Sequence, residues 1–172
     1  MGSWLGAALI LVAAGAAGFV VAGSYSQRPA ILAGLQTALT MLHTEIVYGA
    51  TPLPEALERV GRRTAPAVAP FFAEAAALLA RRRPLPAPEA WRRALLSQRR
   101  RWCLTAADEE ALLDLAPYLG RTSAADQERH LRLALARLAR QQQEAEAEAA
   151  VQARLWRWLG VCVGGLLVIA LA

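Results

Sequence analysis

The chain has 172 residues, of which 56% are hydrophobic and 19% are charged, and its formal net charge is +5. This apolar content excludes disorder as the overall state, and a total of two cysteines excludes a disulfide scaffold. All 19 basic residues are arginines, so the chain lacks the lysine that P-loop ATPases and Schiff-base enzymes require. The composition fits one domain, alone or with membrane anchors.

The N-terminal segment has no charged side chain before Arg28. A helix from Trp4 to Ala22 would be roughly 28 Å long, which matches the hydrocarbon core of a bilayer. A cleaved signal peptide would begin with basic residues, and none is present here. We therefore expect a retained transmembrane helix over residues 3–23.

The C-terminal segment is also apolar, without a charged side chain after Arg157. We expect a second transmembrane helix over residues 155–172, with Arg157 reaching the headgroups and Trp158 lying at the interface. A buried core helix is the alternative. All arginines lie between the two segments, so the positive-inside rule predicts a two-pass protein with a cytoplasmic middle and both termini outside.

The middle of the chain, residues 28–154, has the composition of an all-α domain, because good helix formers dominate and β-branched residues are sparse. We expect a bundle of about six cytoplasmic helices. Pro29 suits the first turn of the first helix and Gly49 its end. An apolar stripe at spacings of 3 and 4 residues marks its buried face: Leu32, Leu35, Leu39, Leu42 and Ile46.

The segment after Gly49 predicts the start of a second helix. Thr51 is expected to cap its free amides, and Glu55 complements the helix dipole. Pro52 and Pro54 occupy positions where no amide donor is needed. A third helix is expected over 66–82.

Three prolines, at positions 84, 86 and 88, predict a stiff turn before a fourth helix over 89–101. Thr105 and Asp108 fit a capping box for a fifth helix that runs to Leu119. Gly120 fits the C-terminal end of that helix. Ser123 and Asp126 are expected to open a long last helix that continues into the second membrane segment.

The residues offer no reaction and no resident cofactor. His43 and Glu45 point to different helix faces, and Asp126 with His130 would supply only two of the three or four ligands of a zinc site. Cys103 has no catalytic neighbour in the sequence. We therefore expect no catalytic, metal or cofactor-binding residue and no small-molecule substrate, and a membrane-bound enzyme is the disfavoured alternative.

Three arginine clusters, at 81–83, 92–93 and 99–101, leave several alternatives open. They form solvated helix faces, or they bind anionic lipid or an acidic protein. Nucleic acid is the least favoured ligand, because aromatic residues near the clusters are limited to Trp91 and Trp102.

Two segments carry a resemblance to a known family. The first runs from Leu42 to Leu57, and the second contains Leu119, Gly120 and Ser123 followed by an Asp-Gln pair. Together with the apolar ends, they resemble the stage III sporulation protein AB family of endospore-forming bacteria over nearly the whole chain. His43 stands where a carboxylate is expected in this family.

The resemblance implies a subunit of a channel-like complex in the mother-cell membrane around the forespore, with a domain similar to type II secretion platform proteins. It implies a cytoplasmic secretion-type ATPase, stage III sporulation protein AA, and other membrane subunits as partners, with the lipid bilayer around the anchors. We expect a non-enzymatic adaptor. The candidates for docking, or for shaping a helix corner only, are Glu45, Tyr48, Thr51, Pro52, Leu53, Glu55, Gly120, Ser123 and Gln127.

Overall fold

The computed structural model describes residues 27–120 and 123–171, and of residues 124, 153, 156, 157 and 159–171 it gives the backbone alone. The chain divides into two units. One is the bundle unit, Arg28–Gln143. The other contains the remaining residues, of which Gln27 and 144–171 are described.

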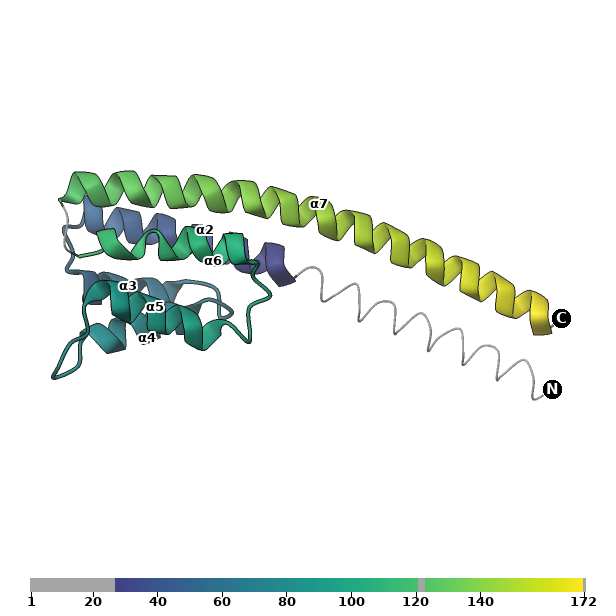
Figure 1. Cartoon of the computed structure of the whole chain (residues 1–172), viewed down its shortest axis with the longest axis horizontal. Helices are drawn as coiled ribbons and strands as arrows, with labels where there is room; N and C mark the ends of the chain where they lie inside the picture. Colours follow the sequence, from purple (N-terminus) through teal and green to yellow (C-terminus); the bar gives the residue numbers. More distant parts are fainter. Residues whose placement is uncertain (1–26, 121–122, 172) are drawn as a thin grey trace. The chain divides into compact units, whose positions relative to one another are not determined.

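The described residues form α-helices and one short 3-10 helix, and they contain no strand (Figure 1). The all-α class expected from composition is therefore confirmed. In chain order the elements are α2 (Gln27–Val47), α3 (Leu53–Arg63), α4 (Ala69–Leu79), α5 (Ala87–Gln98), α6 (Ala106–Leu113), η1 (Ala116–Tyr118) and α7 (Ala124–Leu171).

The bundle unit has two layers (Figure 1). In one, α4 packs against both α3 and α5. In the other, α2 and the first part of α7 run antiparallel, since Gln36 of α2 donates to the Leu138 carbonyl at 3.3 Å and His43 lies beside Glu128. Helix α6 joins this layer, because Arg137 of α7 pairs with Asp114 just after α6.

Aromatic side chains fill the centre of the α3–α5 layer. Phe71 lies edge-on to Phe72 and Trp91, with ring centroids 4.9 and 4.6 Å apart. Each buried indole N–H has a backbone partner: Trp91 donates to the Leu112 carbonyl at 2.8 Å and Trp102 to the Ala67 carbonyl at 2.9 Å. Trp91 therefore ties α5 to α6 in the other layer, whereas Trp102 ties the segment after α5 to the segment between α3 and α4.

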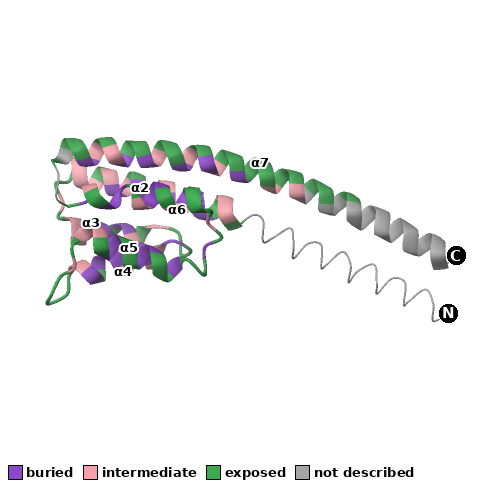
Figure 2. Cartoon of the chain, viewed as in Figure 1, coloured by how far each residue is buried: buried purple, intermediate pink, exposed green. Residues whose placement is uncertain are grey.

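Helix α2 carries the predicted leucine stripe on its buried face. Leu32, Leu35, Leu39 and Leu42 are all fully buried. Figure 2 shows buried stretches on α2. Within the described part of the chain, α2 is also the one helix long and apolar enough to cross a membrane, but its leucine face is buried in the bundle, as in a core helix. The expected transmembrane segment 3–23 lies outside the described residues.

Helix α7 is one continuous helix of 48 residues. In the bundle unit, Leu131 and Leu138 are buried, and Leu135 is partly exposed. The helical backbone extends through residues 155–171, where we expect the second membrane segment. Insertion of that segment into a bilayer stays a prediction.

Three helices have other bounds than the sequence predicts. The helix expected over 89–101 covers Ala87–Gln98. The helix expected over 66–82 covers only Ala69–Leu79, because the chain turns back there and the Leu85 amide donates to the Leu78 carbonyl. The helix expected to reach Leu119 ends at Leu113. Pro117 lacks an amide N–H and cannot continue it, so the chain forms η1 instead.

Candidate docking surface at one end of the bundle

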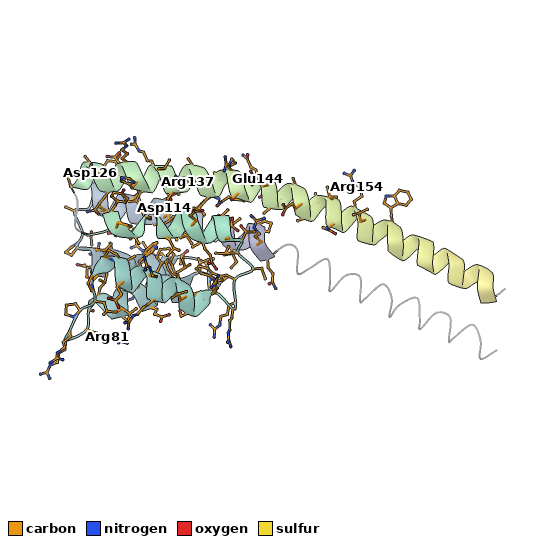
Figure 3. All side chains as sticks on the ribbon, in the orientation of Figure 1. Arg81, Asp114, Asp126, Arg137, Glu144 and Arg154 are labelled. Atoms are coloured by element: carbon orange, nitrogen blue, oxygen red, sulfur yellow. The ribbon has the colours of Figure 1, made fainter. Side chains whose placement is uncertain are left out.

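The bundle unit has two ends with different chemistry. The unit begins at residue 28 and ends at residue 143. Both residues lie at the same end, which we call the neck end. The opposite end holds the turn from α2 to α3 and the start of α7, and we call it the corner end. Figure 3 shows Asp126 and Arg81 at the corner end. All nine candidate residues from the sequence lie on segments at or next to this end.

The backbone of the α2–α3 turn is tight. The Gly49 amide donates to the Thr44 carbonyl and the Thr51 amide donates to the Glu45 carbonyl, both within 3.1 Å. A Cβ atom on Gly49 would lie only 2.7 Å from the Glu45 carbonyl oxygen. Ala50 takes a positive φ of 47°. The turn therefore requires glycine at position 49 for steric reasons.

An ion-pair network braces the turn. The Glu45 carboxylate accepts from the Thr51 hydroxyl at 3.0 Å and from the Arg59 guanidinium at 3.1 Å. Arg59 also donates to Glu55 at 2.6 Å. The hydrogen bond and negative charge of Glu55, with the charge of Glu45, raise the pKa of Arg59 above its ordinary value. The network links the last turn of α2 to the first two turns of α3.

Thr51 does not cap α3, contrary to the prediction. Its hydroxyl donates to Glu45, and the N-cap position is Pro52, which makes no side-chain cap hydrogen bond. Pro54 in the first turn has no backbone N–H, so the cap has one fewer hydrogen-bond donor to satisfy. Glu55 lies in the first turn of α3, as predicted.

Tyr48 is the most exposed large side chain of the turn, at 75% exposure. Its ring meets the His43 ring edge-on, with centroids 6.2 Å apart. His43 is mostly buried, and its Nε2 lies 3.7 Å from a Glu128 oxygen on α7. An aromatic ring held on one side and open on the other is typical of protein contact sites.

Gly120 and Leu53 meet at the same end. Gly120 takes a positive φ of 75°, and a Cβ atom there would lie 3.1 Å from Leu53 Cδ2. The predicted role of Gly120 in ending a helical segment is confirmed for η1, and the close approach of Leu53 is a second reason for glycine. The two residues border a shallow hollow of about 530 Å³.

Ser123 opens α7, as predicted. Its hydroxyl oxygen accepts from the Asp126 amide at 3.2 Å and its hydroxyl donates to the Asp126 carboxylate at 2.8 Å. The Gln127 amide donates to the Ser123 carbonyl, and the Gln127 side chain is largely buried. These two residues thus fix the start of α7, and Gln127 offers little surface to a partner.

The whole chain matches one protein-family model, described as stage III sporulation protein AB, over residues 3–172. The chain belongs to this family. It is 31% identical to stage III sporulation protein AB of Bacillus subtilis (strain 168) over 167 residues, which is 97% of each chain. A solved structure of a stage III sporulation protein AB is similar at a TM-score of 0.67 and 28% identity, covering 72% of this chain and 97% of the other.

Family membership gives the chain a role in sporulation. The relatives carry the name of a sporulation protein and not of an enzyme. Both polar pairs raised by the sequence have structural partners here. His130 stacks on Tyr118 with ring centroids 3.3 Å apart, and the Asp126 carboxylate accepts from the Ser123 hydroxyl that caps α7.

A buried ion pair at the neck end could not be predicted from the sequence. Arg28 donates to both carboxylate oxygens of Asp108, at 2.8 and 3.1 Å. The Asp108 side chain is fully buried, and that of Arg28 is 15% exposed. Asp108 also completes the predicted capping box with Thr105, which is confirmed.

Burial acts to raise the pKa of Asp108. The hydrogen bond from Arg28, those from the backbone and side chain of Thr105, and the charge of Arg28 outweigh burial and lower that pKa below its ordinary value. The only local sign of this site was the capping box. Its partner Arg28 is 80 residues away in sequence, so no spacing rule could find it.

The three arginine clusters lie on exposed surface. Arg93 pairs with Glu89, and Arg99 pairs with Glu109. Trp91 and Trp102 are buried with their indole N–H groups satisfied, so they offer no face for stacking bases. The aromatic residues that gave nucleic-acid binding its limited support are therefore part of the core.

Proposed function

We propose that this protein is a non-enzymatic, membrane-anchored adaptor in the channel complex between mother cell and forespore, and that its bundle docks a cytoplasmic secretion-type ATPase. Family membership supports the sporulation setting. The observation that carries the proposal is the separation of the two ends. The chain enters and leaves the bundle unit at the neck end, so tethers on either side attach there and leave the corner end for a partner.

The chemistry of the corner end supports a protein contact. Tyr48 offers an exposed aromatic anchor, the type of residue that dominates binding energy at interfaces. The network of Glu45, Arg59 and Glu55 fixes the turn that carries Tyr48. We therefore expect a small entropic cost of ordering this turn when a partner binds. In this proposal the membrane segments at 3–23 and 155–172 contact the bilayer and other membrane subunits.

The test is co-purification of the full-length protein, in detergent or nanodiscs, with the ATPase of the same complex. We expect Tyr48→Ala to weaken the interaction by at least tenfold, about 1.4 kcal/mol. Leu96→Ala is the matched control, because Leu96 is also a large exposed side chain, at 56%, on a different helix. Failure of the unaltered protein to bind the ATPase would contradict the proposal.

A second candidate function is contact with anionic lipid at the neck end. Arg99 pairs with Glu109, and Arg100 and Arg101 beside it are exposed and form no recorded ion pair among the described residues. This cluster precedes Thr105, whose hydroxyl is 3.4 Å from Arg28. Exposed arginines next to the attachment point would meet a negatively charged leaflet.

Vesicle flotation separates this candidate from the adaptor function. Arg100→Glu with Arg101→Glu should reduce binding of the full-length protein to phosphatidylglycerol vesicles, while leaving ATPase co-purification unchanged. Arg82→Glu with Arg83→Glu, at the corner end, is the charge-matched control. Equal losses for both pairs would refute a lipid site at the neck end.

A further inference from the structure

The loop between α4 and α5 presents three consecutive arginines at the corner end (Figure 3). Arg81, Arg82 and Arg83 are all exposed, and no ion pair or hydrogen bond of their side chains is recorded among the described residues. The Leu85 amide closes the base of the loop by donating to the Leu78 carbonyl. The loop therefore holds three positive charges that no described residue compensates.

The base of this loop borders the hollow described above. Leu79 and Pro86, which flank the arginines in sequence, line it together with Ala87, Leu53, Pro54 and Gly120. These residues line a shallow, open hollow of about 530 Å³ with a mostly apolar surface. An apolar hollow and a triple positive charge thus adjoin on one face of the bundle unit.

The position of the loop argues against the protein's own membrane as its ligand. Helix α2 has 21 residues and spans the bundle from the neck end to the corner end, a length of about 31 Å. Surface charges are screened over about 8–10 Å at physiological ionic strength. A bilayer at the neck end would therefore have little attraction for these arginines.

The surroundings argue against a long phosphate polymer as well. On the other side of Pro54, Glu55 and Glu58 line a neighbouring groove between α3 and α4. Their carboxylates are exposed, each paired to one arginine four residues along the helix. Among the described residues around these two hollows, the uncompensated positive charge thus lies on one short loop, which suits a short acidic segment.

We propose that the Arg81–Arg83 loop and the adjoining hollow form a binding site for an acidic protein segment that carries an apolar side chain. Carboxylates of the segment bind the guanidinium groups in charge-assisted, bidentate hydrogen bonds. A neighbouring leucine-sized side chain enters the hollow between Leu53, Leu79 and Ala87. The site shares the corner end with Tyr48 but does not involve the Tyr48 side chain, and it does not depend on the identity of the ATPase.

The probe is a fluorescent peptide with two leucines flanked by glutamates, titrated by anisotropy against the full-length protein in nanodiscs of neutral lipid. We expect binding at low ionic strength that weakens as salt rises. The triple variant Arg81→Glu, Arg82→Glu, Arg83→Glu should lose at least tenfold in affinity. Ala87→Phe, which fills the hollow, should lose about as much for the leucine peptide.

Matched controls separate the site from general charge. Reversal of Arg92, Arg100 and Arg101 to glutamate changes the net charge equally, and these exposed residues lie outside the loop. It should leave binding within about twofold. Replacing the glutamates of the peptide by glutamine, or its leucines by serine, should each weaken binding by about tenfold. Circular dichroism confirms that each variant is folded.

Three results would overturn the inference. The first is no binding of the leucine–glutamate peptide to the unaltered protein. The second is equal loss in the control triple variant, which would mean attraction by net charge alone. The third is displacement of the peptide by phosphatidylglycerol vesicles or duplex DNA that bind through Arg81–Arg83, which would assign the loop to phosphates. Loss of ATPase docking in Tyr48→Ala leaves all three measurements unaffected.

Discussion

Both ends of the bundle unit contain contacts between arginine and carboxylate side chains. Because one contact is buried and the other is exposed, we expect their loss to affect stability to different extents. At the neck end, the Asp108 carboxylate is fully buried under Arg28. At the corner end, Arg59 joins Glu45 and Glu55 with about half of its own side chain exposed. Removing one partner of a buried ion pair leaves the other charge buried without a partner, which costs several kcal/mol of stability. Removing one partner of an exposed pair costs little, because water solvates the remaining charge. We therefore expect the neck-end pair to contribute more to stability than the corner-end network, and the corner end is the surface that we propose for recognition.

The largest expected effect is that of Asp108→Ala. It removes the partner of a mostly buried Arg28 and one half of the capping box. We expect a loss of about 3–5 kcal/mol in the free energy of unfolding, measured by denaturant titration of the full-length protein in detergent. Glu110→Ala, an exposed position on the same helix, is the control. A loss below about 1 kcal/mol in the free energy of unfolding would show that the Arg28–Asp108 pair contributes little to stability.

The second prediction concerns acid. Because the folded state lowers the pKa of Asp108, its ionised form stabilises the fold fully above the unfolded value, near 3.8. That stability is lost as pH falls below this value and through the lower pKa of the folded state. Asp108→Asn should remove this part of the pH dependence. Unfolding curves at pH 6 and pH 3 for both proteins test it, and identical pH dependence would contradict it.

A smaller effect is expected for Gly120→Ala at the corner end. The positive φ of Gly120 and the 3.1 Å approach of Leu53 both disfavour a side chain. We expect a loss of about 1–2 kcal/mol in the free energy of unfolding, seen as a lower denaturant midpoint. Ala124→Gly, a few residues along the chain, provides a comparison without positive φ. An unchanged midpoint for Gly120→Ala would mean that the turn relaxes freely.

The smallest effect on stability is expected for Glu55→Gln. It removes the charge from an exposed pair, so the free energy of unfolding should fall by less than about 0.5 kcal/mol. The same variant should weaken ATPase co-purification if the network orients the docking surface. A stability loss as large as that of Asp108→Ala would erase the contrast between the two ends.

Local patterns determined much of the corner. The Ser123 cap, the glycine that ends η1 and the acidic first turn of α3 all depend on residues within four positions of each other. Such contacts form whenever the helix forms, so they can be predicted from spacing. The prediction failed for Thr51, because its hydroxyl had two possible partners and only the fold of α2 against α3 placed Glu45 within reach.

The sequence by itself determined the helical class, the leucine face of α2, the capping box of α6 and the family resemblance. Tertiary structure alone decided which distant charges meet: Arg28 with Asp108, and Arg59 with Glu45. It also decided that the arginines of 81–83 adjoin an apolar hollow while Trp91 and Trp102 are buried. The physical reason is the distance along the chain between the residues that interact. Caps and stripes follow from helix geometry along one segment, whereas these pairings depend on how separate helices pack.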